Sequence, residues 1–307
     1  MAQSVIHIKQ LEKKFGNFQA LRNISFDVNP GEVFGFIGPN GSGKSTTIRI
    51  LLGILKANGG SATIFGKDVW QQAVQIHERI AYVPGDVYLW PNLTGGEIID
   101  FLLKLNHQHH SARTDELIKA FELDPRKKAR TYSKGNRQKV ALIAALSTEA
   151  ELYIFDEPTS GLDPLMEELF QSHVLELKKQ GKSVLLSSHI LSEVERMCDR
   201  IGIVRAGEIV ETGTLNEMRQ LTRTQITVQT QHSLDPVKIL AGIHGFTPIP
   251  ETLNKATFAV DTSELNHVMV VLAQQGIEAL QSMPPTLEDL FMRYYDHAEG
   301  DDSHEAK

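Results

Sequence analysis

The sequence has little of several features that mark specialised classes of protein. Its single cysteine, Cys198, excludes a disulfide within the chain. That composition fits a reducing compartment. Positive charge is not in excess, because 38 acidic residues outnumber 31 basic ones and the net charge is −7. Proteins that bind nucleic-acid backbones usually carry a basic surplus, so nucleic acid is not an expected partner.

Long apolar runs are also missing. A helix needs roughly 18 apolar residues to span a bilayer, and the longer helical runs, such as residues 140–146, fall far short of that length. The N-terminal residues MAQSVIHIKQLEKKF lack the apolar segment of a signal peptide. If the protein acts at a membrane, another chain is therefore expected to cross it. No internal repeat is visible, so each domain is expected once.

Hydrophobic patterning up to about residue 216 predicts alternating strands and helices. Residues 5–37 hold three β-rich runs, and a glycine-rich loop then leads into an apolar helix over residues 46–56. Residues 86–150 have a helical pattern, within which Thr94 and Glu97 show capping-box spacing. The apolar runs at 151–157 and 183–189 are typical of strands covered on both faces of a parallel sheet. A hairpin is predicted to turn at Ala206-Gly207.

The pattern changes after about residue 216. Residues 226–230 and 256–260 alternate like half-buried strands, and residues 263–275 have helical spacing. Residues 217–297 are therefore predicted to form a small α+β domain with the order βαββαβ and one final helix. That helix carries Leu287, Leu290, Phe291 and Tyr294. The polar residues 298–307 are predicted to be a disordered tail.

Residues 38–45, GPNGSGKS, match the phosphate-loop pattern GxxxxGK[ST]. Its glycines let the backbone direct N–H groups at a triphosphate, and the next helix adds its positive end. Lys44 would reach the β- and γ-phosphates, and the Ser45 hydroxyl would bind Mg²⁺. An incidental glycine-rich turn is the alternative, but the apolar strand before the loop and the helix after it favour ATP. The predicted ATP-binding residues are Gly38, Pro39, Asn40, Gly41, Ser42, Gly43, Lys44, Ser45 and Thr46.

Two acids end the apolar run LYIF. Asp156, at the carboxyl end of a predicted strand, can hold Mg²⁺ directly or through water. Glu157 can polarise a water for attack on the γ-phosphorus. Solvated acids at the end of a strand are the alternative, which the neighbouring phosphate loop makes the weaker one.

The order of motifs over residues 4–216 resembles the ABC (ATP-binding cassette) ATPase family. The phosphate loop is followed by YSKGN, then about twenty residues later by FDEPTSGLDP, and then by SSH. The resemblance implies an α/β P-loop NTPase of ABC type. Such a fold has a RecA-like core sheet, an N-terminal antiparallel β subdomain and a helical insert, here at about residues 86–150. The small C-terminal α+β domain would follow it.

Further site residues are implied by the resemblance alone. Phe15 takes the place of the aromatic residue that stacks on adenine, with a core phenylalanine as the alternative. His189 takes the place of the histidine that contacts the γ-phosphate, and Asp163 lies in the dimer-crossing loop. The family signature contacts ATP bound to the opposite subunit, which implies a homodimer or heterodimer of cassettes. Its positions are held by Ser133, Lys134, Gly135 and Asn136.

Three departures from the family pattern stand out. Gly85 replaces the usual glutamine that senses Mg²⁺ and contacts the permease, which leaves Asp86 or water as a substitute. Lys134 and Asn136 replace a glycine and a glutamine of the signature. The signature with these two replacements and the C-terminal segment PTLEDLFMRYY resemble a bacterial branch of exporter ATPases. This branch is of ABC-2 type, includes drug-resistance ATPases, and has its permease on a separate chain.

The sequence therefore predicts a cytoplasmic ATPase, peripheral on the inner face of the cell membrane, that powers separate permease subunits. A non-transport ABC ATPase, a regulatory subunit and an importer ATPase are the alternatives. Cargo, direction and the role of the C-terminal domain are open at this point. Three other features are not predicted to be functional: the histidines His107, His109 and His110, the basic run 126–130, and Cys198.

Overall fold

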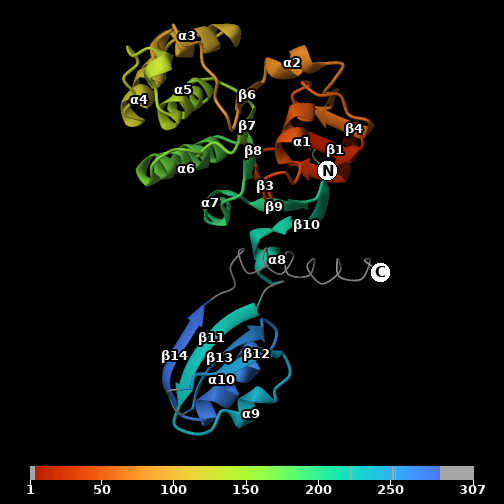
Figure 1. The fold of residues 1–307 in the computed structure, drawn as a ribbon, viewed down its shortest axis with the longest axis vertical. Coiled ribbons are helices and arrows are strands. Elements are labelled where there is room, and N and C mark those ends of the chain that lie inside the picture. Colours follow the sequence, from red (N-terminus) through yellow and green to blue (C-terminus); the bar gives the residue numbers. More distant parts are fainter. Residues whose placement is uncertain (1–3, 221–222, 251, 253, 284–307) are drawn as a thin grey trace. The chain divides into compact units, whose positions relative to one another are not determined.

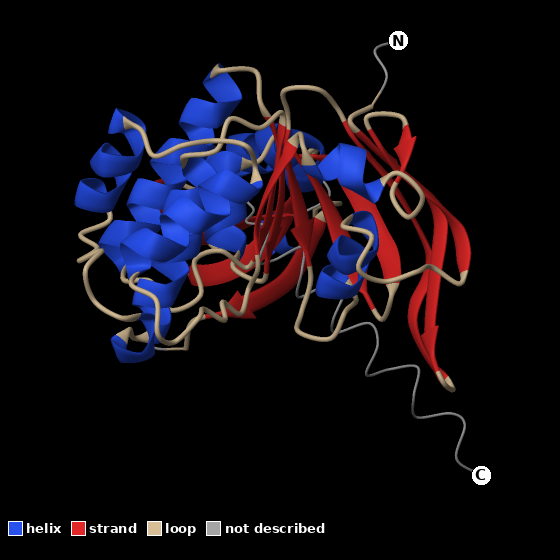
Figure 2. Ribbon diagram, turned by 90° about the horizontal axis from the view of Figure 1, so that it is seen from above, coloured by secondary structure: helices blue, strands red, loops and turns tan. Residues whose placement is uncertain are grey.

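The computed structural model describes residues 4–220, 223–250, 252 and 254–283. The chain divides into two compact units, Met1–Gly213 and Thr214–Lys307. Both units contain strands and helices, which Figure 2 draws in red and blue. The predicted final helix and the predicted tail at 298–307 lie outside the described residues.

A four-stranded antiparallel sheet forms the N-terminal part of the first unit, in the order β2-β1-β4-β5. Its inward residues, including Ile6, Ile8 and Leu11, alternate with exposed ones, which gives the sheet one buried face. Two of its strands are separated by a tight turn at Phe65 and Gly66, which both have positive φ angles. The strands are β1 (Ile6–Phe15), β2 (Phe18–Val28), β4 (Gly59–Ile64) and β5 (Lys67–Asp68).

A six-stranded sheet is the centre of the first unit, in the order β10-β9-β3-β8-β7-β6. The pairs β3–β8, β3–β9, β7–β8 and β6–β7 are parallel. Every residue of β3, β7 and β8 is buried, as expected of strands covered on both faces. The strands are β3 (Val33–Ile37), β6 (Ile80–Val83), β7 (Leu152–Asp156), β8 (Ser183–Ser188), β9 (Arg200–Arg205) and β10 (Glu208–Thr214).

The helices of the first unit follow the strands of this sheet. Figure 1 shows α3, α4 and α5 gathered beside the β6 edge. Thr94 and Glu97 form the predicted capping box at the start of α3. The helical pattern expected from residue 86 is wrong over residues 86–94, and the first helix stops at Leu51 because Gly53 turns the chain. The helices are α1 (Lys44–Leu51), α2 (Ala73–His77), α3 (Gly95–Leu105), α4 (Ala112–Ala120), η1 (Ala129–Thr131), α5 (Lys134–Leu146), α6 (Pro164–Lys179) and α7 (Leu191–Met197).

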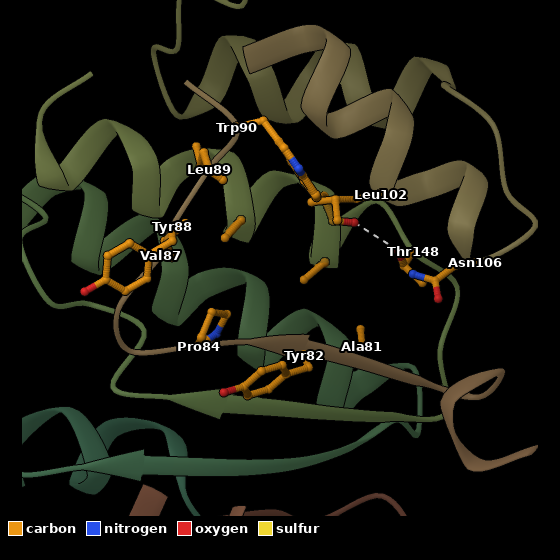
Figure 3. A pocket seen from close by; sticks show the side chains of 13 residues that line it. Ala81, Tyr82, Pro84, Val87, Tyr88, Leu89, Trp90, Leu102, Asn106 and Thr148 are labelled. Atoms are coloured by element: carbon orange, nitrogen blue, oxygen red, sulfur yellow. Dashed lines mark hydrogen bonds between the residues drawn. The ribbon is translucent and has the colours of Figure 1, made fainter. Parts of the chain in front are cut away.

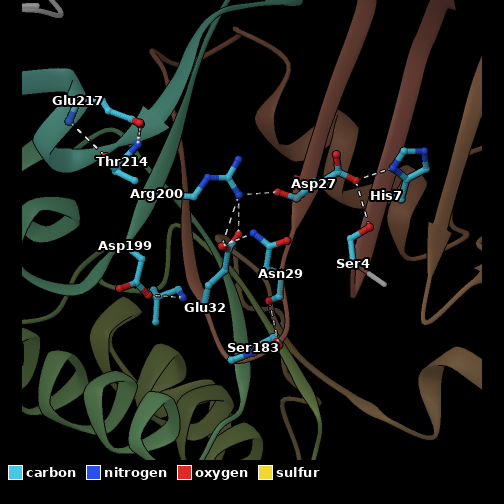
Figure 4. Close-up of polar contacts among 12 residues, drawn as sticks. Ser4, His7, Asp27, Asn29, Glu32, Ser183, Asp199, Arg200, Thr214 and Glu217 are labelled. Atoms are coloured by element: carbon cyan, nitrogen blue, oxygen red, sulfur yellow. Dashed lines mark hydrogen bonds and ion pairs between the residues drawn. The ribbon is translucent and has the colours of Figure 1, made fainter. Parts of the chain in front are cut away.

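Polar contacts fasten the turn at residues 29–32 to the central sheet (Figure 4). Arg200 Nη1 donates to Glu32 Oε1 at 3.1 Å, and Asn29 Nδ2 donates to Glu32 Oε2 at 2.8 Å. Asp199 accepts from the backbone N–H of Val33 at 3.0 Å. Because Glu32 is 8% exposed, these bonds satisfy a charge that burial would otherwise destabilise. They fix the start of β3, the strand that leads into the phosphate loop.

The second unit has the βαββαβ order that its sequence predicts, seen over residues 223–283. Its four strands are antiparallel in the order β12-β13-β11-β14, and its apolar core includes Ile226, Phe258 and Val268. The elements of this unit are α8 (Leu215–Gln220), β11 (Arg223–Thr230), α9 (Asp235–Lys238), β12 (Ile243–Pro248), β13 (Lys255–Asp261), α10 (Leu265–Gln274) and β14 (Ile277–Met283).

Candidate active site

The carboxyl ends of three parallel strands define one edge of the central sheet. The phosphate loop follows β3, Asp156 and Glu157 end β7, and His189 follows β8. Since these strands are parallel and adjacent, their ends meet at the same edge, where ligands bind in sheets of this type. The topology therefore brings together residues that are far apart in the sequence.

The phosphate loop wraps around Lys44, which is 3% exposed. Lys44 Nζ donates to the carbonyl oxygens of Gly38 at 2.6 Å and Pro39 at 3.0 Å. Gly43 precedes the helix with φ +112°, and a Cβ there would lie 2.6 Å from Leu21. A side chain is therefore excluded at this glycine by both conformation and space. The loop holds the ammonium group at the start of α1.

Asp156 is held by two hydroxyl groups. Ser187 Oγ donates to Asp156 Oδ1 at 2.5 Å, and Ser45 Oγ donates to the same oxygen at 3.3 Å. Burial raises the pKa of Asp156, which is 5% exposed, while the two hydroxyl groups oppose that rise. The expected pair of Ser45 and Asp156 is thus in direct contact.

Glu157 lies between Lys44 and His189. Its Oε1 is 3.2 Å from Lys44 Nζ, and its Oε2 is 3.4 Å from His189 Nδ1. The backbone of Glu157 has φ +49°, a left-handed conformation that is costly for a residue with a Cβ. Its N–H donates to the carbonyl oxygen and to the hydroxyl of Ser187, both at 3.1 Å. Ser187, which sequence reasoning missed, therefore positions both acids.

A hollow of about 250 Å³ opens over these groups. Phe15 is 47% exposed at its rim, so the alternative of a core phenylalanine is wrong. Phe18 is 66% exposed and also lines the hollow. It pairs with Phe15 across the two-residue turn of β1 and β2, a hairpin signal that could have identified it. The lining residues are Phe15, Phe18, Ala20, Asn40, Gly41, Gly43, Lys44, Ser45, Thr46 and Glu157.

The signature residues lie elsewhere in the chain and do not line this hollow. Ser133 caps α5 by accepting from the N–H of Asn136 at 3.3 Å. Lys134 Nζ donates to Ser160 Oγ at 2.7 Å. A Cβ on Gly135 would lie 2.4 Å from the carbonyl oxygen of Gly161, so helix and loop touch backbone to backbone. Within one subunit, the signature thus contacts the segment that follows Glu157.

Two other predicted positions have clear local environments. Asp163 caps α6, because its Oδ1 accepts from the N–H of Met166 at 3.0 Å. A Cβ on Gly85 would lie 3.0 Å from the carbonyl oxygen of Asp156 and 3.5 Å from Glu157 Cβ. Gly85 therefore backs closely onto the two acids, whereas Asp86 is exposed on the same loop.

Sequence reasoning also missed the buried acid Glu193, which is 3% exposed. Ser188 Oγ donates to Glu193 Oε2 at 3.2 Å, and burial raises the pKa of this carboxyl. A glutamate in a short helix that also holds Ser192, Glu195 and Arg196 gives no signal of burial in the sequence. Its position next to Ser188 supports the segment that carries His189.

The residues set aside earlier have structural partners. His110 contacts Asp100 at 2.6 Å and Asp115 at 3.0 Å, which joins α3 to α4. In the basic run, Arg126 pairs with Asp124 at 3.1 Å on the surface. Cys198 is buried, and burial raises the pKa of its thiol. Each of these environments fits a structural role.

A second cavity, of about 260 Å³, lies between the loop after β6 and the helices α3 and α5 (Figure 3). Its walls are mostly apolar, and Trp90 meets Phe101 edge to face at 5.1 Å. Tyr88 is 90% exposed beside it. The lining residues are Ala81, Tyr82, Pro84, Val87, Tyr88, Leu89, Trp90, Leu102, Asn106, Ala141, Ala144, Ala145 and Thr148.

A phosphate loop at the end of one parallel strand, with two acids at the end of the next strand but one in the same sheet, defines a P-loop nucleoside triphosphatase. Known proteins place the chain more closely. The family model described as ABC transporter matches residues 21–160. The ABC transporter ATP-binding protein YdbJ of Bacillus subtilis is 39% identical over 229 residues, 74% of each chain.

Two relatives align along almost their whole length. The linearmycin resistance ATP-binding protein LnrL of Bacillus subtilis is 31% identical over 302 residues, 94% of this chain and 97% of its own. The daunorubicin resistance ATP-binding protein DrrA3 of Streptomyces coeruleorubidus is 33% identical over 313 residues, 98% of both chains. The chain therefore belongs to the family of ABC transporter ATP-binding proteins, and it is an ATPase.

Solved structures agree with this assignment. The ATP-binding subunit of an ABC transporter superposes with a TM-score of 0.65 at 31% identity, over 71% of this chain and 93% of that one. A dimeric ATP-binding cassette in a post-hydrolysis state with ADP and Pi gives a TM-score of 0.63 at 26% identity, over 68% and 98%. Among the described residues, no helix has the length and hydropathy needed to cross a membrane.

Proposed function

We propose that this chain is the Mg-ATP-hydrolysing subunit of a bacterial exporter of ABC-2 type, bound to the inner face of the cell membrane by separate permease subunits. The observation that carries the proposal is the convergence of Lys44, Glu157 and His189, with contacts of 3.2 and 3.4 Å, beside a hollow that Lys44 and Glu157 line. The whole-length similarity to two drug-resistance ATP-binding proteins supports the exporter branch.

Each group at this site has a proposed role. Lys44 binds the β- and γ-phosphates, and Phe15 stacks on adenine. Glu157 accepts a proton from the attacking water, and His189 contacts the γ-phosphate and orients that water. Glu157 can do this because its carboxylate is already directed between Lys44 and His189.

The residues at the end of β7 fit a magnesium ion. Ser45 Oγ and Asp156 Oδ1 are 3.3 Å apart, and both are hard oxygen donors of the kind that Mg²⁺ prefers. When bound, Mg²⁺ would neutralise charge on the β- and γ-phosphate oxygens. Asp86 is exposed, so we assign the metal to Ser45 and Asp156 in preference.

The signature supplies the reason for a dimer. Residues 133–136 do not line the hollow of their own chain, so their proposed phosphate contact requires a second cassette placed head to tail. Ser133 and the start of α5 would then meet the partner's γ-phosphate, where helix N-termini bind anions. Asp163, at the start of α6, would lie at the same dimer contact.

The apolar cavity is the proposed docking site for the permease. It is bordered by aromatic side chains that are partly exposed, including Trp90 at 48% and Tyr88 at 90%. A cytoplasmic helix of the permease would bury an apolar face there.

We further propose that residues 1–216 form the nucleotide-binding domain, with residues 86–150 as its helical subdomain, and that 217–297 form an accessory domain.

Affinity purification of the tagged chain from detergent-solubilised membranes tests this function. We expect a stoichiometric partner with about six spans of roughly 20 apolar residues each. Recovery from the soluble fraction alone, or with ribosomes or DNA, would overturn the transport assignment and leave the ATPase chemistry intact. A Trp90→Asp variant should lose the partner and keep ATP hydrolysis, whereas Trp70→Asp, at an exposed tryptophan outside the cavity, should keep both.

A further inference from the structure

The side chain of Gln138, in α5, bridges the loop after β6 and the loop after β7 through two hydrogen bonds. It is 1% exposed. Its Nε2 donates to the carbonyl oxygen of Pro158 at 2.9 Å and to that of Pro84 at 3.4 Å. Pro158 directly follows the proposed general base Glu157, and Pro84 directly precedes Gly85.

The two loops that Gln138 joins are also in direct contact. The ideal Cβ position of Gly85 lies 3.0 Å from the carbonyl oxygen of Asp156 and 3.5 Å from Glu157 Cβ. A larger residue could not sit there without moving one loop away from the other. Gly85 therefore permits close backbone contact at the position where the family pattern implies a glutamine side chain.

The backbone at Glu157 needs such support. A non-glycine residue at φ +49° is strained, and strain of this kind persists only where surrounding contacts hold it. On one side, the N–H of Glu157 donates to Ser187. On the other, the N–H of Ser160 donates to the carbonyl oxygen of Glu157 at 3.2 Å. The bond from Gln138 holds the next peptide, at Pro158.

Gln138 lies on the same face of α5 as residues that line the apolar cavity. Ala141 and Ala145 follow it on α5 at helical spacing, and both line the apolar cavity together with Pro84 (Figure 3). An occupant of that cavity would contact α5 and Pro84 at once. Helix α5 and the loop at Pro84 are two of the three segments that Gln138 joins. The third is the segment after β7, which carries Glu157.

We infer that Gln138 is a positioning residue for hydrolysis: its amide holds the strained Glu157 in place and transmits displacement of α5 and Pro84 to that carboxylate. The inference rests on the proposed function, because it takes Glu157 as the base. Through Gln138, a displacement at the cavity would reach the base Glu157 without a side chain at residue 85.

The test compares variants of the purified full-length chain. Gln138→Met keeps the volume but removes the donor, so we expect kcat for Mg-ATP to fall between about 10- and 100-fold, the effect of misplacing a catalytic group by about 1 Å. Affinity for a fluorescent ATP analogue should stay within about 3-fold, because Gln138 does not line the hollow. Gln171→Met is the matched control, a second buried glutamine, whose kcat should be unchanged.

Gln138→Glu gives a readout that a purely structural role would not produce. An ionised carboxylate cannot donate to the two carbonyl oxygens, but a protonated carboxyl can donate to one. The kcat of this variant relative to wild type should therefore rise as pH falls. Gly85→Ala should lower kcat as well, because its Cβ would press on Asp156, and it keeps the test usable if Gln138→Met does not fold.

The outcomes separate this inference from the function on which it rests. A wild-type chain that binds the analogue but does not hydrolyse Mg-ATP would overturn both. Wild-type hydrolysis with an undiminished kcat in Gln138→Met, or with a Gln138→Glu profile parallel to wild type, would overturn the role of Gln138 alone.

Discussion

Lys44 Nζ and Glu157 Oε1 lie 3.2 Å apart, and the lysine is buried while the glutamate is partly exposed. The proposed phosphate-binding cation and the proposed base therefore form an ion pair. A bound γ-phosphate would compete with Glu157 for this lysine, so the charge of Glu157 would oppose triphosphate binding while serving the proposed chemistry. The first prediction separates these two effects.

Glu157→Gln should keep ATP binding, with unchanged or tighter affinity, because it removes a negative charge beside the triphosphate. Hydrolysis should fall by about 10²- to 10⁴-fold, the usual contribution of a general base. Size-exclusion chromatography with Mg-ATP should then show accumulated dimers. Glu149→Gln, at an exposed glutamate outside the hollow, is the control. Undiminished turnover in Glu157→Gln would rule out this base.

Phe15→Ala should weaken ATP binding by about 1–3 kcal/mol, the range for a base stacked on an aromatic ring. Competition by inorganic triphosphate should not change, because that ligand has no base. Lys44→Ala should weaken both ligands, since Lys44 lies at the phosphate loop. Phe18→Ala measures how much the second ring adds. Equal loss of both ligands in Phe15→Ala would show that the variant disturbs the loop and not the base contact.

Asp156→Asn should stabilise the chain while abolishing Mg²⁺-dependent hydrolysis. Burial raises the pKa of Asp156, so the folded chain holds this proton more tightly than the unfolded chain. The free energy of unfolding therefore falls as pH rises through the raised pKa. Asparagine has no carboxyl to ionise, so it removes this fall in the free energy of unfolding. Its side-chain oxygen can still accept hydrogen bonds from Ser187 and Ser45.

Calorimetry across about pH 4 to 8 measures this effect. The gain in Tm should be about 2–4 °C at the upper end, which corresponds to roughly 1 kcal/mol in a protein of this size. It should shrink toward the acidic end, as wild-type Asp156 becomes protonated first in the folded and then in the unfolded state. A gain that grows as pH falls would contradict the sign of the shift.

His110→Ala should destabilise the helical insert at low pH only. Hydrogen bonds to Asp100 and then Asp115 raise the pKa of His110, so its contribution is complete below the unfolded-state pKa and is lost as pH rises through the raised value. The side chain is 37% exposed, so solvent limits the effect to about 1 kcal/mol or less. The Tm difference from wild type should shrink from about pH 5.5 to 8.5; a difference that widens would refute the assignment.

Local sequence patterns were enough to predict the fold class and several elements. The Thr94 and Glu97 capping box, the two-residue turn at Ala206-Gly207 and the βαββαβ order all depend on neighbours in the chain. Residues 86–94 were predicted as helix because their composition continues the pattern of the next segment. In the structure, residues 87–90 of this segment line the apolar cavity, which is a tertiary contact.

The site was predictable only in part, for a similar reason. Lys44 and Glu157 belong to motifs with fixed spacing, so sequence alone identifies them. Ser187 and Gln138 act through bonds to segments far along the chain, at Asp156 and Pro158. Neither a serine inside an apolar strand nor a glutamine in a helix reveals its distant partner before the chain is folded.

The aromatic lining of the apolar cavity also provides an intrinsic fluorescence signal for binding at this site. The chain has two tryptophans, and Trp90 lies in the cavity while Trp70 lies elsewhere. Trp90 is 48% exposed, so burial by an occupant would change the emission of its indole. A Trp70→Phe chain would therefore carry one fluorophore at the proposed docking site, and arrival of a permease segment could be timed by stopped-flow mixing.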